Sequence, residues 1–509
     1  MTDSNPAICG SKRRMNTGLT IAGHRWVSSA MTVLASVAIG LLARRAYTSF
    51  DTGWDAVAYH LPFAARRVGL CDIHCLTLTE RFEMLFGSFP PLADIVQGLL
   101  WRFTGHPEAA NFANLAALLL LIIYLRRFWL IPWGVAVIAM LAIPLVQIHA
   151  TSSYIDLMTN SAATISILTL LMVLLSPERL NWKAQIFAVV SMIFLGNSKT
   201  QMMPVATLLC ALFLLLVNIC IQAEQRGIWR IDRSHWIGLA TGLVLSASVS
   251  ATALHHLIVF GNPVYPVPLS IMGLHLPGTE VYPSAVSIPD YLRQIPGPLR
   301  WILSTLEFSA YDFRRTPWDI DQDAVPQSVV SFRMGGYFVA YVLLTLAMLV
   351  FAVSRLPAAH SKRIAVSIVL VTVAVACLPA SHELRYYMFW MMVLVSLNLY
   401  ICFSPTCPDF RDRYALSKVA LGLILACSLS VLSLSAGRYF MSTESAEQVL
   451  IDKGVRQTVD TAVKDGDTVC VQGEGPYGPL YASVFHPGRS YSVILNGILG
   501  RCGKVLYIK

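Results

Sequence analysis

Long apolar segments alternate with short polar segments over most of the chain. Apolar runs of roughly 20 residues recur between residues 26 and 435, and a helix of that length crosses the apolar part of a bilayer. The pattern predicts a polytopic helical membrane protein. The predicted spans lie at 26–42, 110–128, 132–150, 156–176, 183–199, 202–222, 236–259, 334–354, 363–380, 386–404 and 415–435.

Two long polar segments separate these spans. Residues 46–109 and 261–333 are too polar to cross a membrane, and we expect both to be loops on one side. Within the first loop, Pro90-Pro91 begins an amphipathic stretch, Leu92 to Phe103. We place this stretch in the membrane interface rather than across the bilayer.

A polar tail follows the last span. Residues 436–509 contain a helix-like run at 444–464, a strand-like run at 468–472 and a closing strand at 505–508. We therefore divide the chain into an N-terminus at 1–25, a membrane domain at 26–435 and a small soluble α/β domain at 436–509, with a βαβ-like core.

Positive charges set the predicted orientation. Lys12, Arg13, Arg14 and Arg25 precede the first span, so residues 1–25 are expected in the cytoplasm and the span serves as a retained signal anchor. With about eleven spans, every inner loop is basic, whereas counting Leu92–Phe103 as a span would turn the later clusters outward. The charges therefore favour about eleven spans and an outer tail. The inner clusters are Arg126-Arg127; Arg179 with Lys183; Arg226, Arg230 and Arg233; Arg355, Lys362 and Arg363; and Arg411, Arg413 and Lys418.

Composition agrees with a membrane protein and excludes several other classes. The 509 residues are 55% hydrophobic and only 13% charged, with a mean hydropathy of +0.60, whereas soluble domains carry about 25% charge. The net charge of +9 lies largely in short inner loops and does not indicate a nucleic-acid partner. The sequence has no phosphate-binding loop of the P-loop type, no GxSxG and no HExxH. ATP hydrolysis, serine hydrolase and zincin chemistry have no support.

Four of the eleven cysteines fall on the predicted outer side. An oxidising compartment permits the pairs Cys71–Cys75 and Cys470–Cys502, although the sequence alone does not fix connectivity. His74 lies between Cys71 and Cys75 and invites a zinc site, but a disulfide or a plain loop fits this spacing better.

Residues suited to chemistry begin directly after the first span. Asp51 and Asp55 stand at the edge of low-dielectric surroundings, where a carboxylate can act as a general base or bind a divalent cation. Two solvated loop carboxylates are the alternative. Tyr59 and His60 make the segment aromatic and stiff, and a helix over 55–67 would end in Arg66-Arg67, placed to meet a phosphate or lipid headgroups.

Further candidates lie at other outer turns. Asp156 begins a span and either caps it or joins the site. Lys199 ends a span and either snorkels to the interface or binds phosphate. The segment His382-Glu383-Leu-Arg385 offers a phosphate clamp, with an interfacial anchor as the alternative. In the long loop, Arg314, Arg315, Asp319, Asp321 and Asp323 are either a docking surface or simply solvated.

Together these features resemble a known superfamily. The resemblance rests on the signal anchor, Asp55-x-x-x-Tyr59, Pro90-Pro91, Tyr154-Ile-Asp156, the Lys199 turn and Gly261-Asn-Pro263. They are similar to the GT-C integral-membrane glycosyltransferases, in the style of bacterial members such as protein O-mannosyltransferases and lipid A aminoarabinose transferases. The resemblance covers roughly residues 25–400, and each motif is short.

The resemblance implies a reaction and a set of roles. Such enzymes transfer a sugar from a polyprenyl-phosphate carrier, and the first-loop acid corresponds to Asp55 and the second to Asp156. Family members often have adjacent acids in this loop, but Ala56 follows Asp55 here, so Asp51 is the candidate second carboxylate and a divalent cation stays open. No other cofactor is expected.

The sequence therefore predicts a glycosyltransferase in a bacterial inner membrane with its active site facing the periplasm. The donor would be a polyprenyl-phosphate sugar, and the acceptor a lipid-linked sugar, glycan or protein of the envelope. We expect substrate to contact the residues Tyr59, His60, Arg66, Arg67, Lys199, His382, Glu383 and Arg385. A transporter or flippase of lipid-linked sugars is the alternative, and a non-catalytic assembly partner is another. Transporters place polar residues at the membrane midplane, whereas here they crowd the outer ends.

Overall fold

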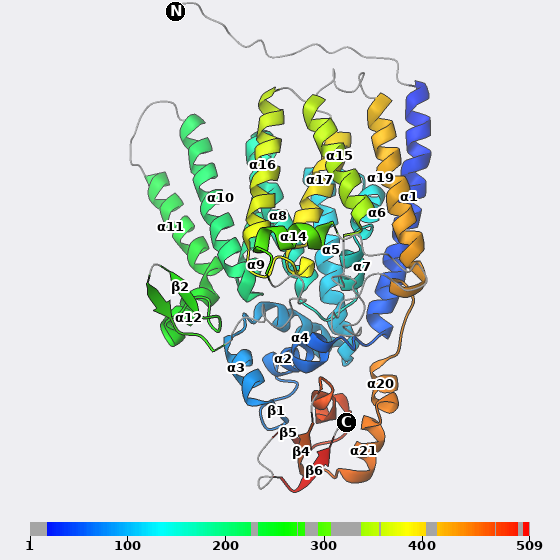
Figure 1. The fold of residues 1–509 in the computed structure, drawn as a ribbon, viewed down its shortest axis with the longest axis vertical. Helices are drawn as coiled ribbons and strands as arrows, with labels where there is room; N and C mark the ends of the chain where they lie inside the picture. Colours follow the sequence, from blue (N-terminus) through cyan, green and yellow to red (C-terminus); the bar gives the residue numbers. More distant parts are fainter. Residues whose placement is uncertain are drawn as a thin grey trace, which may run out of the picture.

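A computed structural model of the chain describes residues 18–224, 233–271, 273–279, 294–306, 337–355, 358–403, 415–473, 475–496 and 502–507. It is mostly helical, and its long helices stand side by side (Figure 1). They are α1 (Gly18–Thr48), α5 (Phe112–Phe128), α6 (Trp133–Leu141), α7 (Pro144–His149), α8 (Asp156–Leu175), α9 (Trp182–Gly196), α10 (Met203–Glu224), α11 (Arg233–Val249), α15 (Val339–Arg355), α16 (Ala358–Cys377), α17 (Phe389–Phe403) and α19 (Ala415–Tyr439).

The described helices include several that are long and apolar enough to cross a membrane. Four segments meet this standard, or five if one bent helix pair counts as a single span. The four are Ser29–Thr48, Pro107–Phe128, Asp156–Leu175 and Thr200–Asn218. Shorter apolar stretches lie in α9, α15, α17 and α19. A multi-pass membrane protein is confirmed, while the number of about eleven spans stays a prediction.

The span predicted at 236–259 is not one straight helix. It bends by 66° between α11 and α12 (Ala251–Phe260). At the bend, the Asn197 amide donates to the Ser248 carbonyl at 2.9 Å, and its oxygen accepts from the Thr252 N–H at 3.0 Å. These two backbone groups would pair with each other in a continuous α-helix. The inserted asparagine therefore explains the bend.

The span predicted at 132–150 is also broken. Helix α6 ends at Leu141, and α7 starts at Pro144. Proline has no N–H to donate to the carbonyl of Met140, four residues earlier, so the helix cannot run on through this position. The sequence analysis located the apolar stretch but did not use the proline as a breaker.

The first loop forms a layer of short helices across the lower ends of the long helices in Figure 1. The predicted helix 55–67 is present, but its first part, Ala56–His60, is π-helical before α2 (Leu61–Arg67). Leu92–Phe103 lies in the 13-residue helix α4 (Leu92–Thr104), which is not among the described helices that are long and apolar enough to cross a membrane. The remaining elements of the loop are β1 (Leu76–Thr77), α3 (Glu80–Ser88) and the turn η2 (Pro107–Asn111).

The tail forms a parallel sheet that the first loop completes. Its strand order is β1-β5-β4-β6, with β1 from the first loop at one edge. The tail elements are α20 (Ala446–Asp452), α21 (Val455–Ala462), β4 (Thr468–Gln472), the turns η8 (Gly478–Tyr481) and η9 (Ser483–Phe485), β5 (Ser492–Leu495) and β6 (Lys504–Tyr507). The predicted helix-like run 444–464 is two helices, because Gly454 between them adopts a left-handed φ of 68°.

The tail and the first loop share one apolar core. Phe50, Leu61 and Trp101 pack in the same buried cluster as Val469 and Phe485. The backbone N–H of Phe50 donates to the Glu444 carbonyl at 2.8 Å. The structure contains both suggested disulfides, Cys71–Cys75 in the first loop and Cys470–Cys502 in the tail. The tail is thus packed onto the same loop that carries Asp55.

Only part of the second long loop is described. It contains β2 (Leu269–Ile271), β3 (Leu274–Leu276) and α14 (Gly297–Thr305), and the two strands pair antiparallel. The candidate docking residues Arg314, Arg315, Asp319, Asp321 and Asp323 lie outside the described residues.

Glycine permits a close crossing of α2 and α4. A Cβ at Gly98 would lie 2.3 Å from the backbone oxygen of Ala64, so the two helices would have to move apart. We expect Gly98→Ala to lower the free energy of unfolding by about 1–3 kcal/mol. Thermal unfolding of the purified chain measures this. The matched control is Gly87→Ala in α3, where a Cβ meets no atom within 4 Å and alanine should be neutral or stabilising. Equal effects of the two changes would contradict the close crossing.

Candidate active site

Four charged side chains from four distant segments meet at one end of the helices. Arg385 Nη1 lies 2.9 Å from Asp55 Oδ2. The Lys199 ammonium pairs with the carboxylate of Asp156. We call these four residues the charge cluster. The structure thus brings together two of the acids and two of the cations that the sequence singled out.

One tyrosine, Tyr386, connects the two ion pairs, and a second, Tyr154, lies against Arg385. The guanidinium carbon of Arg385 lies 5.1 Å from the centre of the Tyr154 ring and 5.2 Å from that of Tyr386. The Lys199 ammonium lies 4.0 Å from the centre of the same Tyr386 ring. Cations over aromatic faces are attracted by the ring electrons. Both cations therefore share one aromatic wall, and the two pairs form a single site.

The two ion pairs differ in how deeply they are buried. The Asp156 side chain is only 2% exposed and Lys199 10%, whereas Asp55 is 21% and Arg385 17% exposed. The four charges sum to zero, which lowers the cost of holding them in low-dielectric surroundings. Because Asp55 is the more accessible acid, it is the better placed to meet a substrate. Removing one partner of such a pair leaves an unpaired buried charge and costs about 3–5 kcal/mol.

The position of Asp55 is fixed by backbone contacts as well as by its side-chain ion pair. Its N–H donates to the Tyr154 hydroxyl at 3.2 Å. Gly53 lies directly against the same tyrosine, because a Cβ there would approach its ring to 2.6 Å. The π-helical turn Ala56–His60 follows at once, and π-turns in helices are frequent at functional sites.

Asp51 braces the loop and is not part of the charge cluster. Its Oδ1 accepts from the Gly53 N–H at 2.9 Å, and its Oδ2 accepts from the Ser153 N–H at 2.6 Å. Burial raises the pKa of Asp51 above its ordinary value, against the opposing effect of these two donors. Since both oxygens are engaged, Asp51 joins the first loop to the turn before Asp156 instead of acting beside Asp55.

A buried asparagine joins Asp156 to Arg385. The Asn160 amide donates to the Asp156 carbonyl at 2.8 Å and to the Arg385 carbonyl at 3.0 Å. Its oxygen accepts from the Phe389 N–H at 2.9 Å. Tyr337 supports the same turn by donating its hydroxyl hydrogen to the Leu384 carbonyl at 3.0 Å. The backbone of the Arg385 turn is therefore held on two sides.

Lys199 is positioned in a similar way. It precedes the short turn η4 (Thr200–Met202), which leads from α9 into α10. The neighbouring Asn197 anchors this turn to the bend between α11 and α12, and its carbonyl accepts from the Leu92 N–H at 2.9 Å. The start of α4 and the Lys199 turn are thus tied together.

Tyr59 and His60 lie beside the cluster. Burial first, and then the nearby Asp55 carboxylate, raise the pKa of Tyr59 well above its ordinary value, so its hydroxyl stays protonated. His60 is buried, and its Nδ1 lies 3.4 Å from Asp94 Oδ1. Its ring also packs 4.4 Å from that of Tyr59. Asp94 was not identified from the sequence, because a single carboxylate in an amphipathic helix is expected on the solvent-exposed face.

Arg66 and Arg67 are not brought to the cluster. Arg66 Nη1 contacts both carboxylate oxygens of Glu83, at 2.7 and 2.8 Å. Arg67 donates to the Phe86 and Phe89 carbonyls. Both guanidinium groups lie over the Phe86 ring, at 4.2 and 4.0 Å from its centre. These contacts fasten α3 to α2, so both arginines are already engaged within the protein.

His382 and Glu383 precede Arg385 and are both buried. Glu383 Oε2 lies 3.9 Å from Arg385 Nε, at the outer limit of an ion pair. Burial lowers the pKa of His382 to about 4, with the positive charge of Arg300 acting in the same direction. His382 is therefore neutral at neutral pH and cannot serve as a cation for phosphate.

The sequence analysis overlooked His149, at the end of α7. It is fully buried, and neither ring nitrogen has a hydrogen-bond partner among the described residues. Its ring lies edge-on to Tyr154, with centres 5.7 Å apart. Burying an imidazole without hydrogen-bond partners costs free energy, so such a group in a folded protein needs an explanation. Nothing in the sequence distinguishes it from an ordinary core histidine within an apolar run.

The donors at the site do not fit a divalent cation. Such ions need several carboxylate or carbonyl oxygens, yet Asp55 and Asp156 are each paired with a cation and Asp51 accepts from two backbone N–H groups. Among the described residues, no group of three or more His, Cys, Asp and Glu side chains is placed to hold a metal ion. The described residues of this cluster therefore do not form a divalent-cation site.

The chain shares its fold with a solved structure of a known protein. At the level of the fold, this agrees with the resemblance that the short motifs indicated. The chain is similar to ArnT from Cupriavidus metallidurans in the apo state, with a TM-score of 0.50 and 12% sequence identity over 94% of this chain and 87% of that chain. At this identity the likeness shows the fold alone.

Two other solved structures are more distantly similar. ArnT from Cupriavidus metallidurans bound to undecaprenyl phosphate matches with a TM-score of 0.49 and 11% identity over 93% of this chain and 86% of that chain. The arabinofuranosyltransferase AftD from Mycobacteria matches with a TM-score of 0.44 and 16% identity over 92% of this chain but only 33% of its own. No protein-family model and no curated protein sequence matches this chain.

The role of Asp51 as a brace can be tested by Asp51→Asn. Asparagine has one acceptor oxygen where the carboxylate has two, so one backbone N–H would face an amide NH₂. We expect the free energy of unfolding to fall by about 1–3 kcal/mol, measured by thermal unfolding.

The pH dependence of the free energy of unfolding gives a second test of the role of Asp51. The folded-state pKa of Asp51 lies above 3.8, so the folded chain takes up this proton at higher pH than the unfolded chain. Its contribution to stability therefore rises as the pH falls through the folded-state pKa, and the variant lacks this gain. The stability difference between wild type and variant should widen toward acid. A constant difference would contradict the assignment.

Proposed function

We propose that this protein is a glycosyltransferase that moves a sugar from a polyprenyl-phosphate donor to an acceptor of the cell envelope. The observation that carries the proposal is the charge cluster, which places an accessible carboxylate and two cations together at one end of the helices. Sugar transfer from a lipid phosphate needs these same groups: a base for the acceptor hydroxyl and positive charge for the leaving phosphate.

In this proposal the resting ion pairs are exchanged when the donor binds. Arg385 holds Asp55 at 2.9 Å, and Lys199 holds Asp156. A donor phosphate offers oxygens that compete with the carboxylates for both cations. Because the Asp55–Arg385 pair is the more exposed of the two, we expect it to open first. The phosphate then binds Arg385, and the Asp55 carboxylate becomes free.

The transfer itself is a single displacement. The acceptor hydroxyl oxygen attacks the anomeric carbon and forms the new glycosidic bond, while Asp55 takes the hydroxyl proton. The bond between the anomeric carbon and the phosphate oxygen breaks, and its electron pair leaves with polyprenyl phosphate. Arg385 and Lys199 stabilise the charge that develops on this phosphate. Attack opposite to the leaving group inverts the anomeric configuration.

The other residues position these groups. Asp156 is nearly inaccessible and fixes the Lys199 ammonium, so we assign it a positioning role. Tyr59 supplies a neutral hydroxyl beside Asp55.

We further propose a bacterial inner membrane as the location, with the cluster facing the periplasm. The basic clusters at the opposite helix ends support this orientation. Both disulfides lie on the same side as the charge cluster, in the first loop and the tail, and disulfides persist in oxidising compartments.

The structure offers less support for a transporter or flippase. Transporters place their polar sites near the middle of the membrane. Helix α8 has no charged residue after Asp156. Its buried hydroxyls at Thr164, Ser166 and Thr169 donate to carbonyls one turn earlier in the same helix. The described charges meet at the helix ends instead.

Asp55→Asn tests the assigned base. Asparagine keeps the size of the side chain but cannot accept the proton, so we expect transfer to fall by about 10²- to 10⁴-fold. The measurement is mass spectrometry of envelope glycans and glycolipids from cells that lack the gene and carry wild type or variant. Asp452→Asn, an exposed carboxylate of the tail, is the control and should behave as wild type. A stably inserted Asp55→Asn protein with full transfer would refute this mechanism.

The proposed orientation can be measured with reporter fusions. A fusion after Arg127, at the end of α5, should report the cytoplasm, and one at Lys509 should report the periplasm. Asp156 begins α8 at the opposite end of the helices from Arg127. A periplasmic reporter at 127 would therefore place Asp156 in the cytoplasm and overturn the assignment.

A further inference from the structure

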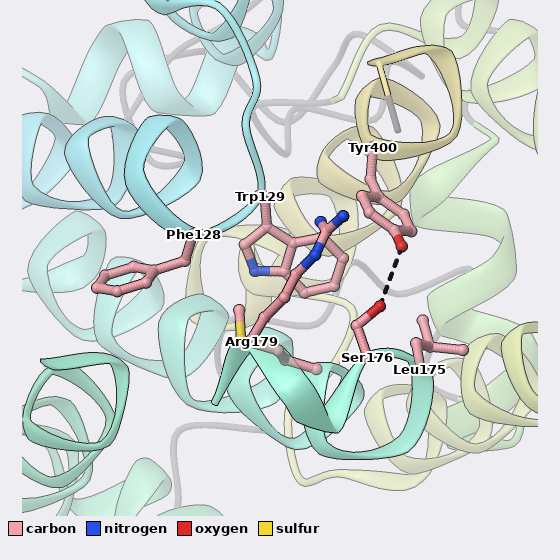
Figure 2. Close-up of a pocket in the computed structure, with 7 residues that line it drawn as sticks. Phe128, Trp129, Leu175, Ser176, Arg179 and Tyr400 are labelled. Atoms are coloured by element: carbon pink, nitrogen blue, oxygen red, sulfur yellow. Dashed lines mark hydrogen bonds between the residues drawn. The ribbon is translucent and has the colours of Figure 1, made fainter. Parts of the chain in front are cut away.

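A second polar site lies at the other end of α8. Asp156 begins this helix at the charge cluster, and Ser176 follows its last residue. The helix has 20 residues and is about 30 Å long. A small pocket opens there between the ends of α5, α8 and α17 (Figure 2). It is lined by Phe128, Trp129, Met172, Leu175, Ser176, Arg179 and Tyr400.

The pocket has an apolar floor and a polar rim. Phe128, Met172 and Leu175 are buried and form the floor. The Ser176 and Tyr400 hydroxyls lie 3.4 Å apart, which is long for a hydrogen bond between hydroxyls. Both side chains are more than nine-tenths buried. Each hydroxyl can therefore turn to a stronger acceptor.

Arg179 supplies the positive charge. It lies in the turn Pro177–Arg179, and its guanidinium carbon is 5.9 Å from the centre of the Tyr400 ring. Figure 2 shows the guanidinium beside the rings of Trp129 and Tyr400. Its side chain is partly exposed at the rim of the pocket, so an external anion can reach the guanidinium.

The surroundings point to a lipid as the source of that anion. Arg126, Arg127 and Lys183 are exposed at the same helix ends. Trp182 is 65% exposed, and the Lys183 ammonium lies 5.5 Å from the centre of its ring. Exposed tryptophans are enriched where a membrane meets water. The pocket therefore lies at headgroup depth, within a basic surface that attracts anionic lipids.

We propose that this pocket binds the phosphodiester headgroup of an anionic phospholipid in the leaflet opposite the active site. The phosphate oxygens accept from Arg179 and from the Ser176 and Tyr400 hydroxyls. Only phosphate oxygens reach the rim, and the glycerol and acyl chains lie outside the pocket in the bilayer. A lipid is preferred to a free phosphate because the exposed Trp182 and the basic residues place the pocket at headgroup depth. The site is independent of the proposed sugar transfer.

Full-length protein in nanodiscs tests this site. The discs contain phosphatidylcholine alone or phosphatidylcholine with phosphatidylglycerol. Thermal unfolding measures stabilisation, and native mass spectrometry counts retained phosphatidylglycerol. Wild type should be stabilised by phosphatidylglycerol and retain it. Arg179→Gln should weaken retention by roughly tenfold or more, because it removes a charge-assisted hydrogen bond. Arg127→Gln, at the same helix ends but outside the pocket, should retain the lipid as wild type does.

The outcomes distinguish lipid binding in the pocket from general attraction of the lipid to the basic surface. Equal loss in Arg179→Gln and Arg127→Gln, or no loss in either, would overturn the proposal. Inorganic phosphate added to phosphatidylcholine discs should give no stabilisation, and an effect equal to that of phosphatidylglycerol would overturn the lipid as ligand. If Arg179→Gln does not fold, Tyr400→Phe supplies the same comparison with a smaller expected loss. Full retention by Tyr400→Phe would then count against the site.

Discussion

The architecture of the proposed active-site end depends on neutralising four charges, two of them buried and two partly exposed. Asp55, Asp156, Lys199 and Arg385 come from segments up to 330 residues apart, and each would be costly to bury alone. Their pairing requires four turns to converge: the end of α1, the start of α8, the α9–α10 turn and the α16–α17 turn. Buried asparagines hold these turns by their backbones, so the position of the charges is set by neutral hydrogen bonds as well as by attraction.

In the proposed function, the same contacts that stabilise the resting protein prepare it for an anionic substrate. An arginine and a lysine held by carboxylates are charged, oriented and partly desolvated before the ligand arrives, which reduces the reorganisation needed on binding. Because the two pairs differ in exposure, we propose that the accessible pair is reactive and the buried pair is structural. The first loop and the tail share a core beneath this site, so the tail supports the loop that carries Asp55.

The sequence predicted the helical class and placed most helix ends within several residues, and the four cluster residues are among the larger set of candidates that it named. The lengths of the apolar runs and the predicted membrane side of each turn were sufficient for these predictions. Both follow from the local hydrophobic pattern and from the distribution of charge. It did not predict which acid meets which cation, since pairing is set by packing between distant helices. Asp51, Arg66 and Arg67 looked reactive but bind backbone groups or Glu83, and such partners are invisible in a single sequence. Asn197, which bends one predicted span, gave no signal either.

The central claim is that the Asp55–Arg385 pair opens when a lipid phosphate binds. A cryo-EM structure of the full-length protein with a polyprenyl phosphate tests it directly. The account predicts phosphate oxygens in hydrogen-bond contact with Arg385 and Lys199, and an Asp55 carboxylate separated from the Arg385 guanidinium and open to an acceptor. A bound polyprenyl phosphate with the Asp55–Arg385 ion pair still closed, and its phosphate held elsewhere, would contradict it.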